Sequence, residues 1–367
     1  MKNEYLMWEK AIEAIKTSDK KWIKDNQHAF SFFFRRENER PQGKLNAEAL
    51  AAHYHAGLFK MFLGKPYNGL ALPLPEGSKW IENAAALDGN WGWLLAIGVG
   101  GAYFADYMHT ETAEKYFSPK DALVAGSGKP FGEAIKLNNG KYKVSGKWSY
   151  CSGSEQASMY TAVTRKEGEI SAFVVPRKLV NIDPDWNAVG LPLTCSHSII
   201  LEEAEIPSSC FFNLLEKPRE SSYPLATYPF MLFARACFVP VVCGISEAVW
   251  NSISGLLEEK KELWQQFQPD RYKYVARKIG EFSEQKSGLT EAFYQKLEKS
   301  WENHLDGKDP LEKEVSSIGL QLSEFCYHSV AAIIPKLGMK VLEKGEPLQQ
   351  KWQNLQTAYQ HMSFHEY

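Results

Sequence analysis

A β-rich segment interrupts a chain that otherwise has the sequence pattern of α-helices. The segment extends from Gly126 to Pro207, is punctuated by glycine, and contains an Asn139-Gly140 pair where apolar and polar residues alternate. Such a pair is a strong signal for a β-hairpin. Helical spacing of apolar residues dominates before residue 117 and again after residue 223. A small sheet domain between two helical regions must bury side chains or a ligand where the sheet meets the helices. The Ser, Thr and Trp residues in its turns favour a planar cofactor lying against the sheet.

The composition is that of an ordinary soluble globular protein. The 367 residues are 44% hydrophobic and 23% charged, and the formal net charge is -2. This charge gives no electrostatic reason to expect nucleic acid or an anionic membrane as a partner. The N-terminal sequence MKNEYLMWEKAIEAIK lacks the apolar core of a signal peptide, and we expect no run of the ~18 apolar residues that a membrane span requires. We therefore expect a cytoplasmic protein.

The cysteines predict neither a disulfide framework nor a metal site. The six cysteines form no CxxC pair, and the nine histidines do not cluster with them. We expect buried thiols. They are Cys151, Cys195, Cys210, Cys237, Cys243 and Cys326.

The change of pattern along the chain predicts three domains. They are a helical N-terminal domain (1–120), a middle β domain (121–220) and a C-terminal helical bundle (221–367). In the N-terminal part, Asn46 is a candidate helix cap. Gly98, Gly100 and Gly101 stand in an apolar helical stretch, where each costs about 1 kcal/mol relative to Ala. They predict the close approach of another backbone or of a ligand.

Five segments spread over most of the chain match motifs of one family. They are AALDGNWGWLLAIG, GKYKVSGKWSYCSGSEQASMY, AFVVP, GLPLTCSHSIILEEAEIP and PLQQKWQNLQTAYQH. Together they resemble the acyl-CoA dehydrogenase-like superfamily. The resemblance implies an α+β fold with N-terminal helices, a β-barrel-like middle domain and a C-terminal four-helix bundle. It also implies a flavin-dependent oxidoreductase that binds FAD or FMN and forms a homotetramer or homodimer.

Two features resemble one branch of this superfamily, the oxygenase components of two-component flavin monooxygenases. They are the Trp-x-x-x-Ser-Gly form of WSYCSG and His361 near the end of the chain. This branch uses reduced flavin, delivered by a flavin reductase, to oxygenate a small-molecule substrate. The dehydrogenases of the superfamily instead keep FAD bound and use a glutamate as base.

The resemblance also implies a set of site residues. His361 and Ser152 are the candidate catalytic residues, since imidazole titrates near neutrality and Ser152 would lie near the flavin N5 atom. The implied cofactor-binding residues are Ser127, Phe131, Gly132, Trp148, Ser152, Gly153, Thr194, Ser196 and Arg235. Ser and Gly are also favoured in turns for backbone reasons alone, so ordinary turn chemistry is the alternative interpretation.

Departures from the motifs keep three functions open. The dehydrogenase base aligns with Met362, and the nearest carboxylate is Glu366. The Arg-Asp pair of the superfamily is here Gln353-Asn354. A histidine of the monooxygenases aligns with Gly101, and Gly338 alone remains of a Gly-rich turn that contacts the cofactor. The chain is thus a dehydrogenase-like enzyme, a monooxygenase component or a degenerate scaffold without catalysis.

Overall fold

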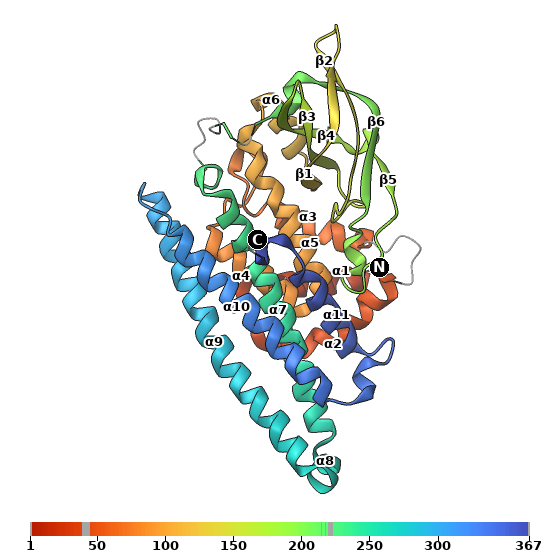
Figure 1. The fold of residues 1–367 in the computed structure, drawn as a ribbon, viewed down its shortest axis with the longest axis vertical. Helices are drawn as coiled ribbons and strands as arrows, with labels where there is room; N and C mark the ends of the chain where they lie inside the picture. The colour runs from red at the N-terminus through yellow and green to blue at the C-terminus, as the bar shows by residue number, and fades with distance from the viewer. Residues whose placement is uncertain (1, 39–44, 214, 217, 219–222, 366–367) are drawn as a thin grey trace.

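The computed structural model describes residues 2–38, 45–213, 215–216, 218 and 223–365, and it has helices on both sides of a sheet domain in sequence. The N-terminal and C-terminal helices lie together, and the sheet covers one end of them (Figure 1). This order of helices, sheet and helices confirms the expected α+β class.

Among the described residues, six α-helices precede the sheet. They are α1 (Lys2–Thr17), α2 (Lys20–Asn38), α3 (Ala47–His55), α4 (Leu74–Leu87), α5 (Gly89–Gly100) and α6 (Thr110–Phe117). Asn46 caps α3 as expected, since its side chain accepts the backbone N–H of Ala49 at 2.8 Å. Asp88 caps α5 by accepting the backbone N–H groups of Asn90 and Trp91. This cap divides the long apolar stretch into two helices that pack against each other.

The glycines at the end of α5 have different roles. A Cβ atom on Gly98 would lie 2.6 Å from the ring of Phe59, and one on Gly101 would lie 1.8 Å from Val124. Both positions confirm the close approach that the sequence predicts. The expectation was wrong for Gly100, because open space surrounds the position of its missing Cβ atom.

The middle region forms one seven-stranded sheet. Its strands are β1 (Val124–Lys136), β2 (Lys141–Trp148), β3 (Met159–Lys166), β4 (Glu169–Pro176), β5 (Asn181–Asp183), β6 (Ser198–Pro207) and β7 (Phe211–Phe212). Their order is β5-β6-β2-β1-β3-β4-β7, and every pair is antiparallel except β1 with β3. Gly140, with φ of 76°, forms the expected turn between β1 and β2. The described pairings leave β5 and β7 as edges of the barrel-like domain.

The C-terminal region consists of α7 (Phe230–Glu259), α8 (Lys261–Phe267), α9 (Pro269–Leu305), α10 (Glu312–Ile333) and α11 (Pro347–Tyr359). Helix α8 is short and joins the long helices α7 and α9 at one end of the molecule (Figure 1). Helices α7, α9, α10 and α11 pack on one another, and α4 and α5 pack on α7. The bundle and the N-terminal helices therefore share one core.

Helix α7 corrects one sequence-based expectation. The sequence predicts no segment that could cross a membrane. In the described part of the chain, α7 is nevertheless long and apolar enough to do so by length and composition alone. However, 83% of its most apolar window is buried inside the fold. It is therefore the central helix of the core, and its apolar character comes from being surrounded by other helices.

Buried polar groups complete the core. All six cysteines are buried, as expected. Lys286 on α9 lies 2.8 Å from Glu247 on α7 and 3.6 Å from Glu82 on α4. Tyr294 also donates to Glu82 at 2.8 Å. These contacts fix α4 against the bundle. In the part of the chain that is described, no group of three or more His, Cys, Asp or Glu residues is placed to hold a metal ion.

Candidate functional site

Two loops of the sheet domain are joined where the sheet meets the helices. The loop 150–156 follows β2, and the loop 191–197 precedes β6. The backbone N–H of Gly153 donates to the carbonyl of Thr194 at 2.6 Å. Because β2 and β6 are neighbours in the sheet, these loops leave the same edge and position each other.

Both loops contain backbone in the left-handed region. Tyr150, Leu191 and Cys195 have φ of 63°, 52° and 43°, and Gly153 has φ of 81°. For a non-glycine residue such a conformation costs about 1–3 kcal/mol and is concentrated at functional sites. Three of the nine non-glycine residues with positive φ in the described part of the chain lie in these two touching loops.

A row of hydroxyl groups crosses the two loops. Ser152 Oγ lies 2.7 Å from Ser196 Oγ, and Ser196 Oγ lies 2.8 Å from Thr194 Oγ1. Thr194 Oγ1 donates to the carbonyl of Leu191 at 2.7 Å. At the other end, the indole N–H of Trp93 on α5 donates to Ser152 Oγ at 3.0 Å. The row links the sheet domain to the helical core.

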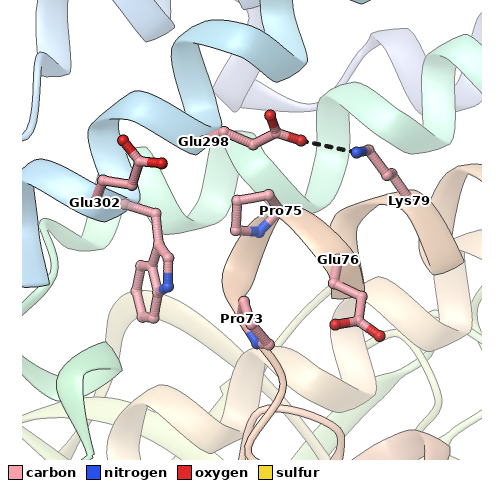
Figure 2. A pocket seen from close by; sticks show the side chains of 7 residues that line it. Pro73, Pro75, Glu76, Lys79, Glu298 and Glu302 are labelled. Atoms are coloured by element: carbon pink, nitrogen blue, oxygen red, sulfur yellow. Dashed lines mark hydrogen bonds and ion pairs between the residues drawn. The ribbon is translucent and has the colours of Figure 1, made fainter.

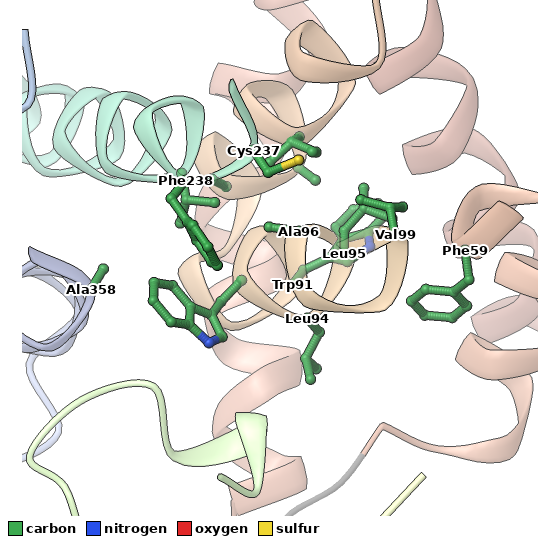
Figure 3. Close-up of a cluster of buried hydrophobic side chains, with 14 of the residues drawn as sticks. Phe59, Trp91, Leu94, Leu95, Ala96, Val99, Cys237, Phe238 and Ala358 are labelled. Atoms are coloured by element: carbon green, nitrogen blue, oxygen red, sulfur yellow. The ribbon is translucent and has the colours of Figure 1, made fainter. Parts of the chain in front are cut away.

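Aromatic rings and one imidazole lie at the Trp93 end of this hydroxyl row. The rings of Trp93 and Phe238 are 5.1 Å apart between centroids. The ring of His361 is 5.4 Å from Trp93 and 4.3 Å from Phe238. These residues come from α5, from α7 and from the segment after α11. Figure 3 shows Phe238 of α7 between α5 and Ala358 of α11.

The His361 ring is neutral near pH 7. Burial, followed by the nearby His365, lowers the pKa of His361 to about 4. Its Nδ1 atom accepts the backbone N–H of Ser363 at 3.3 Å. In a neutral imidazole the proton then resides on Nε2, which is a hydrogen-bond donor. The site therefore contains an uncharged donor beside two aromatic rings.

Two asparagines hold the loop 191–197 against the helices. The side-chain oxygen of Asn90 accepts the backbone N–H of Leu193 at 3.0 Å, and that of Asn354 accepts the backbone N–H of Leu191 at 2.7 Å. All four residues are buried. Asn354 replaces the aspartate of the superfamily motif, and its amide oxygen is sufficient for this contact.

Comparison with known proteins shows similarity to flavin monooxygenases. The chain is 26% identical over 329 residues to indole-3-acetate monooxygenase of Pseudomonas putida, which covers 86% of this chain and 82% of that protein. It is 25% identical over 167 residues, 44% of each chain, to the oxygenase subunit HsaA of a flavin-dependent monooxygenase from Rhodococcus jostii. No protein-family model matches the sequence.

A solved structure gives the fold. XiaF from Streptomyces sp., in complex with FADH2 and glycerol, superposes with a TM-score of 0.77 and 18% identity, covering 96% of this chain and 94% of that chain. The chain has the acyl-CoA dehydrogenase-like fold. Among proteins with this fold it resembles the oxygenase components, as the WSYCSG segment and His361 indicate.

Four of the site residues that the resemblance implies belong to the hydroxyl row or touch it. Ser152, Thr194 and Ser196 form the row, and Gly153 adjoins Ser152. Ser152 and Ser196 retain 5% and 4% of their surface exposed, whereas Thr194 has none. Thr194 contacts Ser196, and its expected place in the pocket wall stays a prediction. The candidate catalytic residue His361 reaches the row through Trp93.

The pyrimidine-edge residues lie on β1. Ser127, Phe131 and Gly132 fall in the part of the strand where its pairing with β3 is irregular. Phe131 is 46% exposed, so its side chain is available to a ligand or a second subunit. No contact joins these three residues to the hydroxyl row, and their role stays a prediction.

Trp148 and Arg235 are not part of this cluster. Trp148 has no exposed surface, donates its indole N–H to the carbonyl of Val163 at 2.7 Å and packs edge-on against Phe173. Its side chain is core of the sheet domain, and its expected role as a flavin wall stays a prediction. Arg235 is partly buried on α7, three residues before Phe238, and its predicted contact with flavin stays untested.

The departures from the motifs have a physical basis. The side chain of Val124 fills the space beside Gly101, so a histidine does not fit there. Met362, at the position of the dehydrogenase base, is 68% exposed and cannot accept a proton. Glu366 lies outside the described residues. His361 is the imidazole that lies beside Trp93 and Phe238.

The sequence analysis missed Trp93, Phe238 and Asn90. Trp93 and Asn90 lie in the quoted segment AALDGNWGWLLAIG, so the match to a motif was visible. The sequence does not reveal their partners, because Ser152 and Leu193 are remote in sequence from Trp93 and Asn90. Phe238 has no motif signal, since aromatic residues on an apolar helix are usually core.

Two hollows lie elsewhere on the molecule. The first, of about 280 Å³, is shallow and lies between α4 and α9 beside the 2.8 Å ion pair of Lys79 and Glu298 (Figure 2). The second, of about 510 Å³, lies between α2, α7 and α11 and includes Lys351. Lys351 donates to Ser252 at 2.8 Å, and burial lowers its pKa to about 8. Neither hollow includes a residue of the hydroxyl row.

The residues at the row fit a flavin ring. Ser152 is 5% exposed, and a Cβ atom on Gly153 would meet only Leu94 at 3.7 Å, which leaves room for a plate to approach the backbone. Trp93 and Phe238 supply flat apolar surfaces. A flavin needs hydrogen-bonding partners near N5 and apolar walls, and this set of groups provides both.

Proposed function

We propose that the chain is the oxygenase component of a two-component flavin monooxygenase. It would take reduced FAD or FMN from a separate flavin reductase and transfer one oxygen atom from O2 to a small aromatic substrate. The observation that carries this proposal is the meeting of the Ser152 hydroxyl row with Trp93, Phe238 and His361 between the sheet and the bundle. The relatives named above support the same class of reaction.

The flavin would lie with its N5 side against Ser152 and Gly153. When bound, the reduced flavin supplies two electrons, so that one oxygen atom enters the substrate and the other leaves as water. Ser127 and the backbone at Phe131 and Gly132 would contact the pyrimidine edge. Arg235 is the candidate for a phosphate contact.

The chain's own residues would bind and orient the substrate. A flat aromatic molecule fits beside Trp93 and Phe238, because stacked and edge-on aromatic contacts are both favourable. The Nε2–H group of His361 is a neutral donor for a polar substituent of that molecule. Burial around these groups excludes water, which strengthens each polar contact.

Acyl-CoA dehydrogenation is a weaker proposal for this chain. Its base position is occupied by Met362, whose thioether cannot abstract the α-proton of a thioester. The degenerate scaffold is weaker for a different reason. Strained backbone at Tyr150, Leu191 and Cys195 has a cost, and a site that has lost its ligand gains nothing from it.

The assembly and location are also proposals. The family likeness favours a homotetramer or homodimer, and the buried cysteines suit a reducing cytoplasm. The division into 1–120, 121–220 and 221–367 is kept as a proposal for domain limits, although the helical parts share one core. Light scattering on the purified protein would give the oligomeric state.

Anaerobic titration tests the proposed function. Purified protein should bind reduced FMN or FAD and, after mixing with O2 and an aromatic substrate such as indole-3-acetate or resorcinol, add one oxygen atom to it, detected by mass spectrometry. Ser152→Ala should weaken flavin binding by roughly 5- to 10-fold, the value of one hydrogen bond. Ser149→Ala, directly after the end of β2 and outside the row, is the control. Binding of neither redox state would refute the proposal.

A further inference from the structure

The hydroxyl row at the site has a fixed direction. The carbonyl of Leu191 only accepts hydrogen bonds, so the single proton of Thr194 Oγ1 must point to it across 2.7 Å. Thr194 therefore accepts from Ser196, and the proton of Ser196 is committed to Thr194. Ser152 must then give its own proton to Ser196. Every proton in the row points away from Ser152 and toward Leu191.

Trp93 reinforces this direction. An indole N–H is only a donor, and Trp93 uses it on Ser152 Oγ at 3.0 Å. Ser152 thus accepts one hydrogen bond, has given away its proton and retains a single unused lone pair. Toward any further group Ser152 is an acceptor and not a donor. Its unused lone pair can accept from an N–H group, but it opposes another lone pair.

This polarity distinguishes the two redox states of a flavin. The N5 atom of a reduced flavin carries a hydrogen, whereas N5 of an oxidised flavin has a lone pair. We propose that Trp93, Ser196 and Thr194 are positioning residues that hold Ser152 as an acceptor, so that the site selects reduced over oxidised flavin. The inference rests on the proposed function, because it needs the flavin N5 atom near Ser152.

The preference for reduced flavin follows from the free energy that is lost when the hydrogen bonds of the hydroxyl row are reversed. To donate to an oxidised flavin, Ser152 must withdraw its proton from Ser196, and the bond between the two hydroxyls then loses its only available proton. Ser152 and Ser196 are both buried, so water does not replace the lost hydrogen bond. Leaving one buried partner unpaired corresponds to about a tenfold or larger loss of affinity for oxidised flavin.

Thr194→Val is the decisive variant. Valine has nearly the same shape as threonine, and residue 194 has no exposed surface that the substitution could alter. The Leu191 carbonyl still accepts a hydrogen bond from the indole N–H of Trp186 at 3.1 Å. Without an acceptor on Thr194, the proton of Ser196 turns to Ser152, and the proton of Ser152 is released toward the flavin. Thr194→Ser keeps the hydroxyl and is the matched control.

The experiment measures dissociation constants of oxidised and reduced FMN anaerobically, together with the midpoint potential of the bound flavin. Wild type and Thr194→Ser should bind reduced FMN at least tenfold more tightly than oxidised FMN. In Thr194→Val the ratio of the dissociation constants of oxidised and reduced FMN should fall by about tenfold. This change lowers the midpoint potential of the bound flavin by about 30 mV. Ser196→Ala should shift both quantities the same way, which keeps the test open if Thr194→Val fails to fold.

The outcomes separate this inference from the proposed function. Wild type that binds reduced FMN, with an unchanged ratio and potential in both Thr194→Val and Ser196→Ala, overturns the inference and leaves the proposed function standing. Equal wild-type affinity for both redox states overturns it as well. Failure of wild type to bind either state overturns the inference and the proposed function together.

Discussion

Acidification should destabilise this protein through His53, a histidine buried in the N-terminal helices. Its ring has no exposed surface and lies 5.2 Å from Trp8, 5.2 Å from Trp91 and 5.4 Å from Phe59 between centroids. Its Nδ1–H donates to the carbonyl of Ala49 at 2.6 Å, and no described residue offers Nε2 a partner. A second proton would thus sit in an apolar cage.

The magnitude follows from the change in pKa. Burial lowers the pKa of His53 from 6.5 to about 4. Between these values the unfolded chain binds a proton that the folded protein does not, so the free energy of unfolding falls as the pH falls. The contribution is fully present above pH 6.5. A difference of about 2.5 units corresponds to a loss of roughly 3 kcal/mol when pH 4 is reached.

His53→Phe isolates this contribution. Phenylalanine keeps an aromatic ring in the cage and cannot titrate, so stability at pH 7.5 should change little while the loss toward pH 4 should shrink by roughly 3 kcal/mol. Urea unfolding at several pH values measures the difference between variant and wild type. His55→Gln, at an exposed position on the same helix, should behave as wild type. Parallel pH curves for His53→Phe and wild type would refute the argument.

Three other substitutions test the core and the site. Lys286→Met leaves the buried Glu82 carboxylate without its cation and should lower the free energy of unfolding in urea by about 3–5 kcal/mol. Adding Glu82→Leu should restore stability, and a single variant as stable as wild type would contradict this prediction. Asn354→Leu removes the acceptor of the Leu191 N–H and should cost about 1–3 kcal/mol; no change would show that the loop is held otherwise. His361→Leu removes the Nε2–H donor and should lower kcat/KM by roughly 10-fold, the value of one hydrogen bond. Since the pKa of His361 is lowered to about 4, wild-type kcat should show no His361 titration between pH 5 and 9, and a histidine-dependent loss near pH 6.5 would contradict the neutral ring.

The sequence predicted the parts of the fold that depend on local pattern. The order of helices, sheet and helices follows from the change of period, and the Asn46 cap and the Gly140 turn follow from short-range backbone chemistry. The convergence of Ser152 with Ser196 came from the resemblance alone, because no local rule brings together residues from two loops.

The errors arose where neighbours in space decide the outcome. Trp148 and Ser152 are four residues apart, yet Trp148 enters the core of the sheet domain while Ser152 faces the helices. Helix α7 has a composition that also suits a membrane, and only its packing against α4, α10 and α11 shows that it is core. Gly100 has no close neighbour at all, which its sequence context cannot reveal.

The most direct test of the central claim is a crystal structure of the protein soaked with reduced FMN without oxygen. We expect the isoalloxazine ring to lie with N5 toward Ser152, beside Gly153, with Phe238 and His361 facing the space left for substrate. Electron density for the ring only in the hollow beside Lys351, or no ring against Ser152, would refute the proposed flavin site.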